Sequence, residues 1–178
     1  IAPSFTSIPQ LSKLCCENNI RIGAQNAHWE KQGAFTGEIS LDMLKESEVT
    51  FVITGHSERR KIFLEDDTLI FKRTKGVLEA GLKAILCIGE TLSEREDSLT
   101  EKVLATQLSY VKELPNRENL IIAYEPVWAI GTGKTATLEE IKDAHAYINS
   151  ISNNTSILYG GSVTPDNFGD IISVPLVD

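Results

Sequence analysis

Short runs of apolar, often β-branched residues alternate along the chain with longer amphipathic segments. The runs recur at roughly thirty-residue intervals, the repeat length of a strand–helix–strand unit with parallel strands. Strands are predicted at residues 20–26, 50–55, 83–89, 120–125 and 156–161, with residues 1–5 as the remnant of another. No linker or low-complexity tract interrupts the pattern, so we predict one α/β domain over residues 1–178.

Helix start signals lie between the predicted strands. Ser93 and Glu96 have capping-box spacing ahead of a helix that we expect to reach about residue 113. Thr137 and Glu140 have the same spacing ahead of a predicted helix at residues 138–151. Chemically active residues gather after the strand ends, where parallel α/β folds bind ligands. The alternation alone does not separate a closed barrel from an open, doubly wound sheet.

Composition excludes several classes of function. A formal net charge of −8 argues against non-specific binding to nucleic acid or to an anionic membrane surface. The three cysteines, Cys15, Cys16 and Cys87, have no metal-ligand spacing and indicate reduced thiols in a cytoplasmic setting. No apolar run is long enough to span a bilayer, and no signal peptide is visible.

The candidate base is Glu125, which ends an apolar run and precedes Pro126. Proline holds the preceding residue extended, and Gly131 and Gly133 then give the following loop freedom at its tip. A base beside an amide-rich lid suits proton abstraction from a small phosphorylated carbonyl compound. The two hinges of this lid are predicted at Pro126, Val127 and Trp128, and at Lys134, Thr135 and Ala136. The alternative is an ordinary strand-end glutamate that caps a helix or pairs with a lysine.

The same loop superficially resembles two nucleotide-binding motifs. The phosphate loop of NTPases needs a glycine where Trp128 stands, and the dinucleotide fingerprint fits only loosely as Gly131, Gly133 and Ala136. Its first glycine does not follow the strand directly, and no acidic residue ends the next strand. Nucleotide binding is therefore not favoured.

Two further segments carry candidate chemistry. His56 follows the predicted strand at residues 50–55, at the expected start of a short helix whose dipole favours a neutral imidazole. The alternative is a histidine that only caps a turn, as we interpret His28 and His145. Gly161 and Ser162 follow the last predicted strand, where small residues allow backbone amides to approach an anion. Here the alternative to a phosphate site is a tight strand-to-helix turn.

Residues 54–60, 120–136 and 159–162 together resemble the triosephosphate isomerase family, and the resemblance runs along nearly the whole chain. It implies a (β/α)8 TIM barrel, no metal or organic cofactor, and a cytoplasmic homodimer. The implied reaction interconverts dihydroxyacetone phosphate and D-glyceraldehyde 3-phosphate by proton transfer through an enediolate. A neutral histidine beside a glutamate base is the arrangement described for that family.

The resemblance assigns roles residue by residue. Glu125 would carry the proton between the two carbons, and His56 would move protons at the two oxygens. Phosphate would be held by Gly131, Gly161 and Ser162. Ser57 and Glu58 would lie close to the catalytic centre, and Thr36 and Glu38 would lie at the tip of a loop that reaches into the partner subunit.

The chain also departs from the family pattern. Its first residues match the end of the family's second strand, so the Asn-x-Lys motif of the first strand has no counterpart, and residues 174–178 stop before the last strand. About six of the eight barrel strands are therefore expected. We interpret the chain as a partial sequence that is inactive alone. The alternative is a catalytically inactive barrel fragment that acts as an interaction module.

Overall fold

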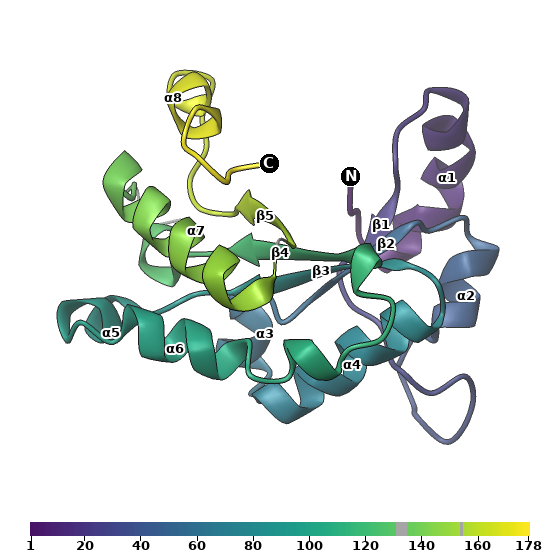
Figure 1. Ribbon diagram of the computed structural model, residues 1–178. Helices are drawn as coiled ribbons and strands as arrows, with labels where there is room; N and C mark the ends of the chain where they lie inside the picture. The colour runs from purple at the N-terminus through teal and green to yellow at the C-terminus, as the bar shows by residue number, and fades with distance from the viewer. Residues whose placement is uncertain (131–134, 154) are drawn as a thin grey trace. The chain divides into compact units, whose positions relative to one another are not determined.

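The computed structural model describes residues 1–130, 135–153 and 155–178 (Figure 1). Within these residues five strands follow the order β1-β2-β3-β4-β5, and the pairs β1–β2, β2–β3 and β4–β5 are parallel. The strands are β1 (Gly23–Ala24), β2 (Phe51–Thr54), β3 (Lys83–Ile88), β4 (Leu120–Tyr124) and β5 (Ser156–Tyr159). The α-helices are α1 (Ile8–Glu17), α2 (Leu41–Glu46), α3 (Ser57–Ile62), α4 (Asp67–Glu79), α5 (Leu92–Glu96), α6 (Thr100–Gln107), α7 (Leu138–Ser152) and α8 (Phe168–Ile172). Short 3-10 helices lie at η1 (Phe5–Ser7), η2 (Val111–Glu113), η3 (Arg117–Asn119) and η4 (Val127–Ala129).

Each of the five strands lies inside a predicted range, but the sixth predicted strand, at residues 1–5, is wrong. Only Ile1 has strand-like hydrogen bonds: its amino group donates to the Arg21 carbonyl (2.8 Å), and its own carbonyl accepts from the Gly23 amide (2.8 Å). The chain then turns into η1 at Phe5. The 3-10 turn ends the extended backbone before a strand can form.

The capping box at the start of α7 is confirmed, with Thr137 and Glu140 bonding reciprocally. The capping box predicted from Ser93 is wrong, because Thr91 and Glu94 make it instead. The predicted continuous helix to residue 113 is also wrong. Ser98 has a φ of 57° just after α5, and this left-handed residue ends the helix before α6 begins.

The chain divides into two compact units. The first comprises Ile1–Gly55, Glu65–Leu86 and Leu114–Leu120, and the second comprises His56–Leu64, Cys87–Glu113 and Ile121–Asp178. The single continuous domain stays a prediction. In the first unit α4 packs against β2, and the buried Arg73 guanidinium pairs with Glu65 (3.1 Å) and Glu38 (3.2 Å).

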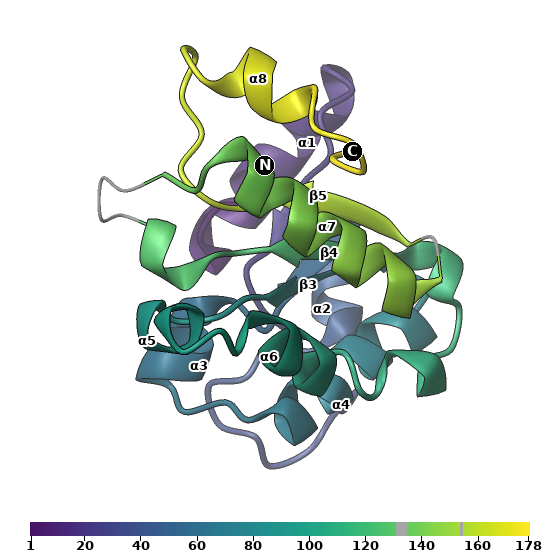
Figure 2. The same ribbon diagram turned by 60° about the vertical axis from the view of Figure 1, so that its left-hand side comes forward.

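The second unit contains β4, β5 and the residues that carry the predicted chemistry. Helix α7 lies alongside β5 (Figure 2) and buries Ile141 and Ile148 completely. Ile141 also packs in a cluster with Ala136, Ile171 and Val174, which ties the start of α7 to α8 and the residues after it. This packing fixes the framework from which the ends of β4 and β5 project.

Candidate active site

Glu125 is held between the ends of neighbouring strands of the second unit. Its amide donates to the Ile88 carbonyl at the end of β3 (2.7 Å), and the Gly160 amide donates to the Tyr124 carbonyl (2.8 Å). The Glu125 side chain is 8% exposed. A carboxylate is thus delivered by rigid backbone to the carboxyl ends of parallel strands, where the sequence predicted it.

Two glycines allow this placement. A Cβ on Gly89 would lie 1.7 Å from the Glu125 carbonyl oxygen, and a Cβ on Gly160 would lie 2.9 Å from the Glu125 Cγ. Only glycine fits at residue 89, because the obstacle there is backbone. Sequence reasoning missed Gly89, although a glycine directly after an apolar strand is a known sign of close backbone approach.

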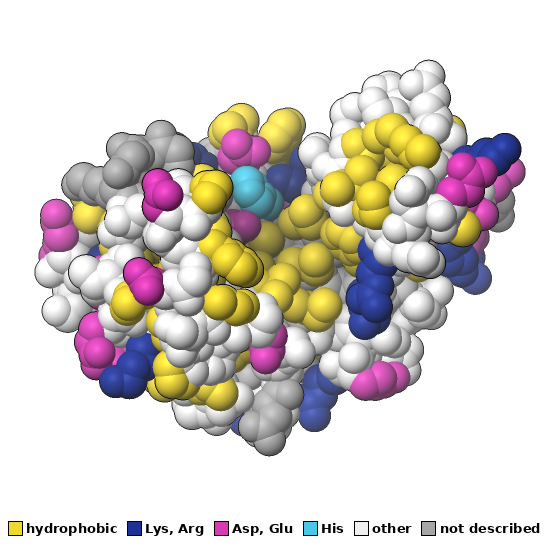
Figure 3. All heavy atoms as spheres, turned by 90° about the horizontal axis from the view of Figure 1, so that it is seen from above, with side chains coloured by type: hydrophobic (Ala, Val, Ile, Leu, Met, Phe, Trp, Pro, Cys, Tyr) yellow, Lys and Arg dark blue, Asp and Glu magenta, His cyan; other side chains and the backbone are white. Residues whose placement is uncertain are grey.

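His56 faces the Glu125 carboxylate. Its Nε2 lies 3.6 Å from Glu125 Oε1, while its Nδ1 accepts a hydrogen bond from the Glu58 amide (3.3 Å) as the N-cap of α3. Because Nδ1 is an acceptor, a neutral ring carries its proton on Nε2, the nitrogen that faces Glu125. The His56 side chain is 31% exposed. In the space-filling view of Figure 3, hydrophobic and charged side chains are interspersed on the visible face.

The two carboxylate oxygens of Glu125 have different partners. The Ser57 amide donates to Glu125 Oε2 (3.2 Å), which leaves Oε1 facing the imidazole. Ser57 is buried, whereas Glu58 is exposed and its Oε2 lies 3.7 Å from His56 Nδ1. Burial, followed by the charge of Glu125 and a hydrogen bond to it, raises the pKa of Cys87 well above its usual value. Cys87 therefore stays a neutral thiol beside the carboxylate.

A second buried carboxylate, Glu90, was missed by sequence reasoning. It is fully buried just after β3 and accepts hydrogen bonds from Tyr124 Oη (3.1 Å) and Trp128 Nε1 (3.0 Å). Arg95 Nη1 pairs with the same carboxylate at 3.0 Å. Burial and the Glu90 charge raise the pKa of Tyr124 well above its usual value, so the phenol remains a donor. The available signal was the glycine–glutamate pair directly after an apolar strand.

The predicted phosphate residues are only partly within the described structure. Ser162 Oγ donates to the Ala129 carbonyl (2.6 Å), which joins the segment after β5 to η4. A Cβ on Gly161 would lie 2.2 Å from Tyr159 Oη, so a larger residue there would require the Tyr159 side chain to move. Gly131 lies outside the described residues.

Of the lid residues, Pro126 and Ala136 are buried, Val127 and Trp128 are half-buried, and Thr135 is exposed. Lys134 and Gly133 lie outside the described residues. A pocket of about 630 Å³ is lined in part by Ser57, Val127 and Trp128. The amino-terminal side of the predicted lid thus forms a wall of a cavity next to the Glu125–His56 pair.

The dimer-loop candidates Thr36 and Glu38 and the histidines His28 and His145 remain to be placed. Thr36 is exposed in the first unit, where Glu38 pairs with Arg73. His28 is buried and stacks on Trp29 with ring centroids 4.1 Å apart. His145 is completely buried, with its Nδ1 2.8 Å from the Leu176 carbonyl oxygen. The Glu30 amide donates to His28 Nδ1 (3.1 Å), as a turn cap requires, whereas His145 lies within α7 and is not a turn cap.

Among the described residues, no group of three or more histidine, cysteine, aspartate or glutamate side chains is suited to a metal ion. No helix in the described part of the chain has the length and apolar character to cross a membrane.

Fold and site define a parallel α/β protein with a glutamate–histidine pair at its strand ends. The family model for triosephosphate isomerase matches residues 1–178. The chain is 46% identical over 187 residues to the triosephosphate isomerase of Thermodesulfovibrio yellowstonii, covering all of this chain and 76% of the relative. It is 48% identical over 179 residues to that of Aquifex aeolicus, covering 94% and 72% respectively. The chain therefore belongs to the triosephosphate isomerase family, and its sheet and helices correspond to an incomplete TIM barrel.

Proposed function

We propose that Glu125 and His56 are the acid–base pair of a triosephosphate isomerase. The observation that carries the proposal is the approach of His56 Nε2 to within 3.6 Å of Glu125 Oε1, with His56 Nδ1 occupied as an acceptor. Glu125 takes the proton from the carbon beside the substrate carbonyl and returns it to the neighbouring carbon. His56 donates its Nε2 proton to the developing oxyanion and recovers a proton from the other oxygen of the enediolate.

Phosphate binding and water exclusion are the second part of the proposal. Gly161 and Ser162 offer small side chains and backbone amides after β5, and Gly131 would add an amide from the lid. The hydrogen bond from Ser162 to Ala129 (2.6 Å) supports this, because it joins the two segments that would meet at the phosphate. A lid over residues 126–136 would keep water from the enediolate.

The assembly of the protein is also a proposal. The family relationship supports a homodimer in which Thr36 and Glu38 belong to the contacting loop. Buried Cys15 and Cys87 and exposed Cys16 are free thiols, which supports a cytoplasmic setting.

Isomerase activity tests the proposal directly. The conversion of dihydroxyacetone phosphate would be followed by ¹H NMR in D2O for the chain alone and for a flanked chimera. In the flanked chimera, the segments of the Thermodesulfovibrio yellowstonii enzyme that lie outside the matched region are joined to this chain. We expect activity in the flanked chimera and negligible activity in the chain alone, because the five strands of the described residues are fewer than the eight of a closed barrel.

The matched controls are Glu125→Gln and Glu118→Gln in the flanked chimera. Glu118 is exposed in η3, so its substitution removes the same charge without touching the site. Loss of turnover in Glu125→Gln alone would support the assignment. Equal turnover in both variants would refute it, and an inactive chimera with intact folding would favour the interaction-module alternative.

A further inference from the structure

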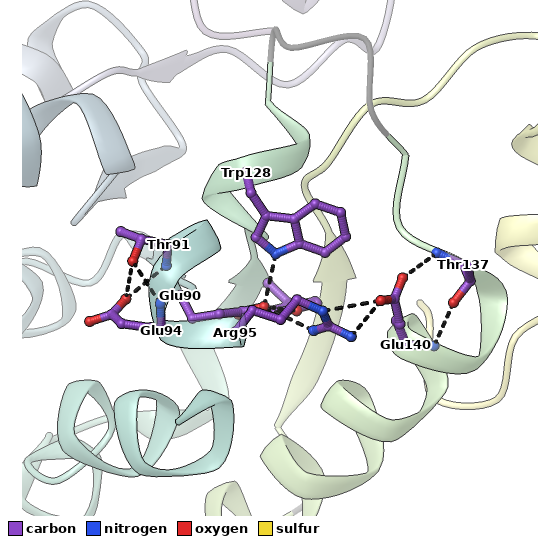
Figure 4. A network of polar contacts seen from close by, with 8 residues as sticks. Glu90, Thr91, Glu94, Arg95, Trp128, Thr137 and Glu140 are labelled. Atoms are coloured by element: carbon purple, nitrogen blue, oxygen red, sulfur yellow. Dashed lines mark hydrogen bonds and ion pairs between the residues drawn. The ribbon is translucent and has the colours of Figure 1, made fainter. Parts of the chain in front are cut away.

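Arg95 makes contacts that the acid–base proposal does not use. It lies in the last turn of α5, and its side chain is 23% exposed. Its guanidinium contacts residues from two segments that are separated in sequence by the stretch 130–136, as Figure 4 shows.

On one side Arg95 contacts the Glu90–Trp128 pair. Nη1 of Arg95 donates to Glu90 Oε1 (3.0 Å), the oxygen that also accepts from Trp128 Nε1 (3.0 Å). The guanidinium carbon lies 5.1 Å from the centre of the Trp128 ring, within cation–π range. Arg95 therefore contacts both the carboxylate that accepts from the Trp128 indole and one face of the indole ring itself.

On the other side Arg95 contacts the start of α7. Nε and Nη2 lie 3.1 Å and 2.8 Å from Glu140 Oε1, while Glu140 Oε2 accepts from the Thr137 amide (2.7 Å). Partial burial would raise the pKa of Glu140, but hydrogen bonds from Thr137 and Arg95 together lower it, so the carboxylate stays charged. The capping box of α7 is thus joined to Arg95 through one side chain.

We propose that Arg95 is a positioning residue that sets the segment ending at Ala129 in a fixed geometry relative to the start of α7, through Glu90 and Glu140. Only a guanidinium presents several donors in a rigid fork, so one side chain bonds both carboxylates and still covers the indole. Glu90 also accepts from Trp128 in η4, and Glu140 also accepts from Thr137 at the start of α7, so displacement on one side is transmitted to the other. The consequence for turnover rests on the proposed isomerase function, whereas the coupling itself does not.

The test uses 5-fluorotryptophan labelling of the chain, which contains two tryptophans, Trp29 and Trp128. Glu140→Gln keeps the capping box, since glutamine serves there as well as glutamate, but removes the charge that Arg95 binds. The matched control is Glu139→Gln on the same helix, since Glu139 is exposed and pairs with Lys142. We expect Glu140→Gln to shift the Trp128 ¹⁹F resonance and not that of Trp29, and Glu139→Gln to shift neither.

Coupling through Arg95 is shown by repeating Glu140→Gln in an Arg95→Met background, where the Trp128 shift should vanish. A shift that persists there, or that is absent in the parent, would overturn the proposal. If Arg95→Met does not fold, Arg95→Lys serves instead, because lysine lacks the planar guanidinium fork that presents separate donors to the two carboxylates.

An unfolding cycle gives an independent measure. Trp128 and Glu140 contact Arg95 from opposite sides, so the effects of Trp128→Phe and Glu140→Gln on the unfolding constant should deviate from multiplicativity by about threefold or more when Arg95 is present. Simple multiplicativity would contradict the coupling. Neither measurement depends on turnover, so failure of the isomerase proposal would leave both interpretable.

Discussion

The close approach of Gly89 to β4 predicts that Gly89→Ala damages both stability and catalysis. The added Cβ would lie 1.7 Å from the Glu125 carbonyl oxygen, whereas real Cβ atoms essentially never come within 3.0 Å of another heavy atom. The oxygen is backbone and cannot rotate away, so the chain at Glu125 must move by more than an ångström. Overpacking of this kind costs roughly 1–3 kcal/mol, and we expect the upper end or beyond.

The catalytic cost follows from the same displacement. The Glu125 amide is bonded to Ile88 at the end of β3, so a shift there moves the carboxylate relative to His56. A misplacement of about 1 Å at a reacting group can cost on the order of 100-fold in rate. Urea unfolding of the chain measures the first effect, and isomerase kinetics of the flanked chimera measure the second.

Gly169→Ala is the matched control. Gly169 lies in α8 with nothing within 4 Å of the position a Cβ would take, and alanine suits a helix interior better than glycine by about 0.5–1 kcal/mol. We expect stability to be unchanged or raised and turnover to be unchanged. If Gly89→Ala were as stable and as active as Gly169→Ala, the reasoning from backbone approach would be refuted.

Three further predictions concern single titratable or nucleophilic groups. Glu125→Asp in the flanked chimera should lower kcat sharply and change KM much less, because the shorter side chain withdraws the base from the substrate carbon; unchanged kcat would remove Glu125 from its role. Exposed Cys16 should react with iodoacetamide in the folded chain, while Cys87 should react only after unfolding because it is buried and its pKa is raised; peptide mass spectrometry distinguishes the two. Burial lowers the pKa of His145, so the unfolded chain binds a proton there that the folded chain does not, and this loss of stability begins as the pH falls below about 6.5. Melting temperatures at pH 7.5 and 5.5 should fall less in His145→Gln than in the parent, and an equal fall in both would contradict that assignment.

Local sequence patterns were sufficient to predict much of this framework. Apolar runs predicted the locations of the five strands in the described residues, because a strand that is buried in a sheet consists of consecutive apolar residues. Thr137 and Glu140 likewise predicted the start of α7, since a capping box involves only one helical turn. Glu125 and His56 were predicted from their places after strands, together with the lid-like segment after Glu125 and the resemblance to the family.

Other features were decided by residues far apart along the chain. The glycine–glutamate pair after an apolar run marks Glu90 only weakly, and its role comes from Tyr124, Trp128 and Arg95, which surround it only after folding. The break between α5 and α6 is local, but serine rarely adopts the left-handed conformation that Ser98 has there, so its identity does not predict the break.

The sequence by itself determined which residues form strands, where α7 begins, and which glutamate and histidine follow strand ends. Only the tertiary structure decided that Gly89 must be glycine, that His56 Nε2 faces Glu125 Oε1 at 3.6 Å, and that the Ser57 amide holds the other oxygen of Glu125. The physical reason is range. Secondary structure follows from the pattern of apolar and polar residues over a short stretch of chain. The geometry of a site follows from contacts between distant segments, and the sequence pattern does not determine how those segments are placed relative to one another.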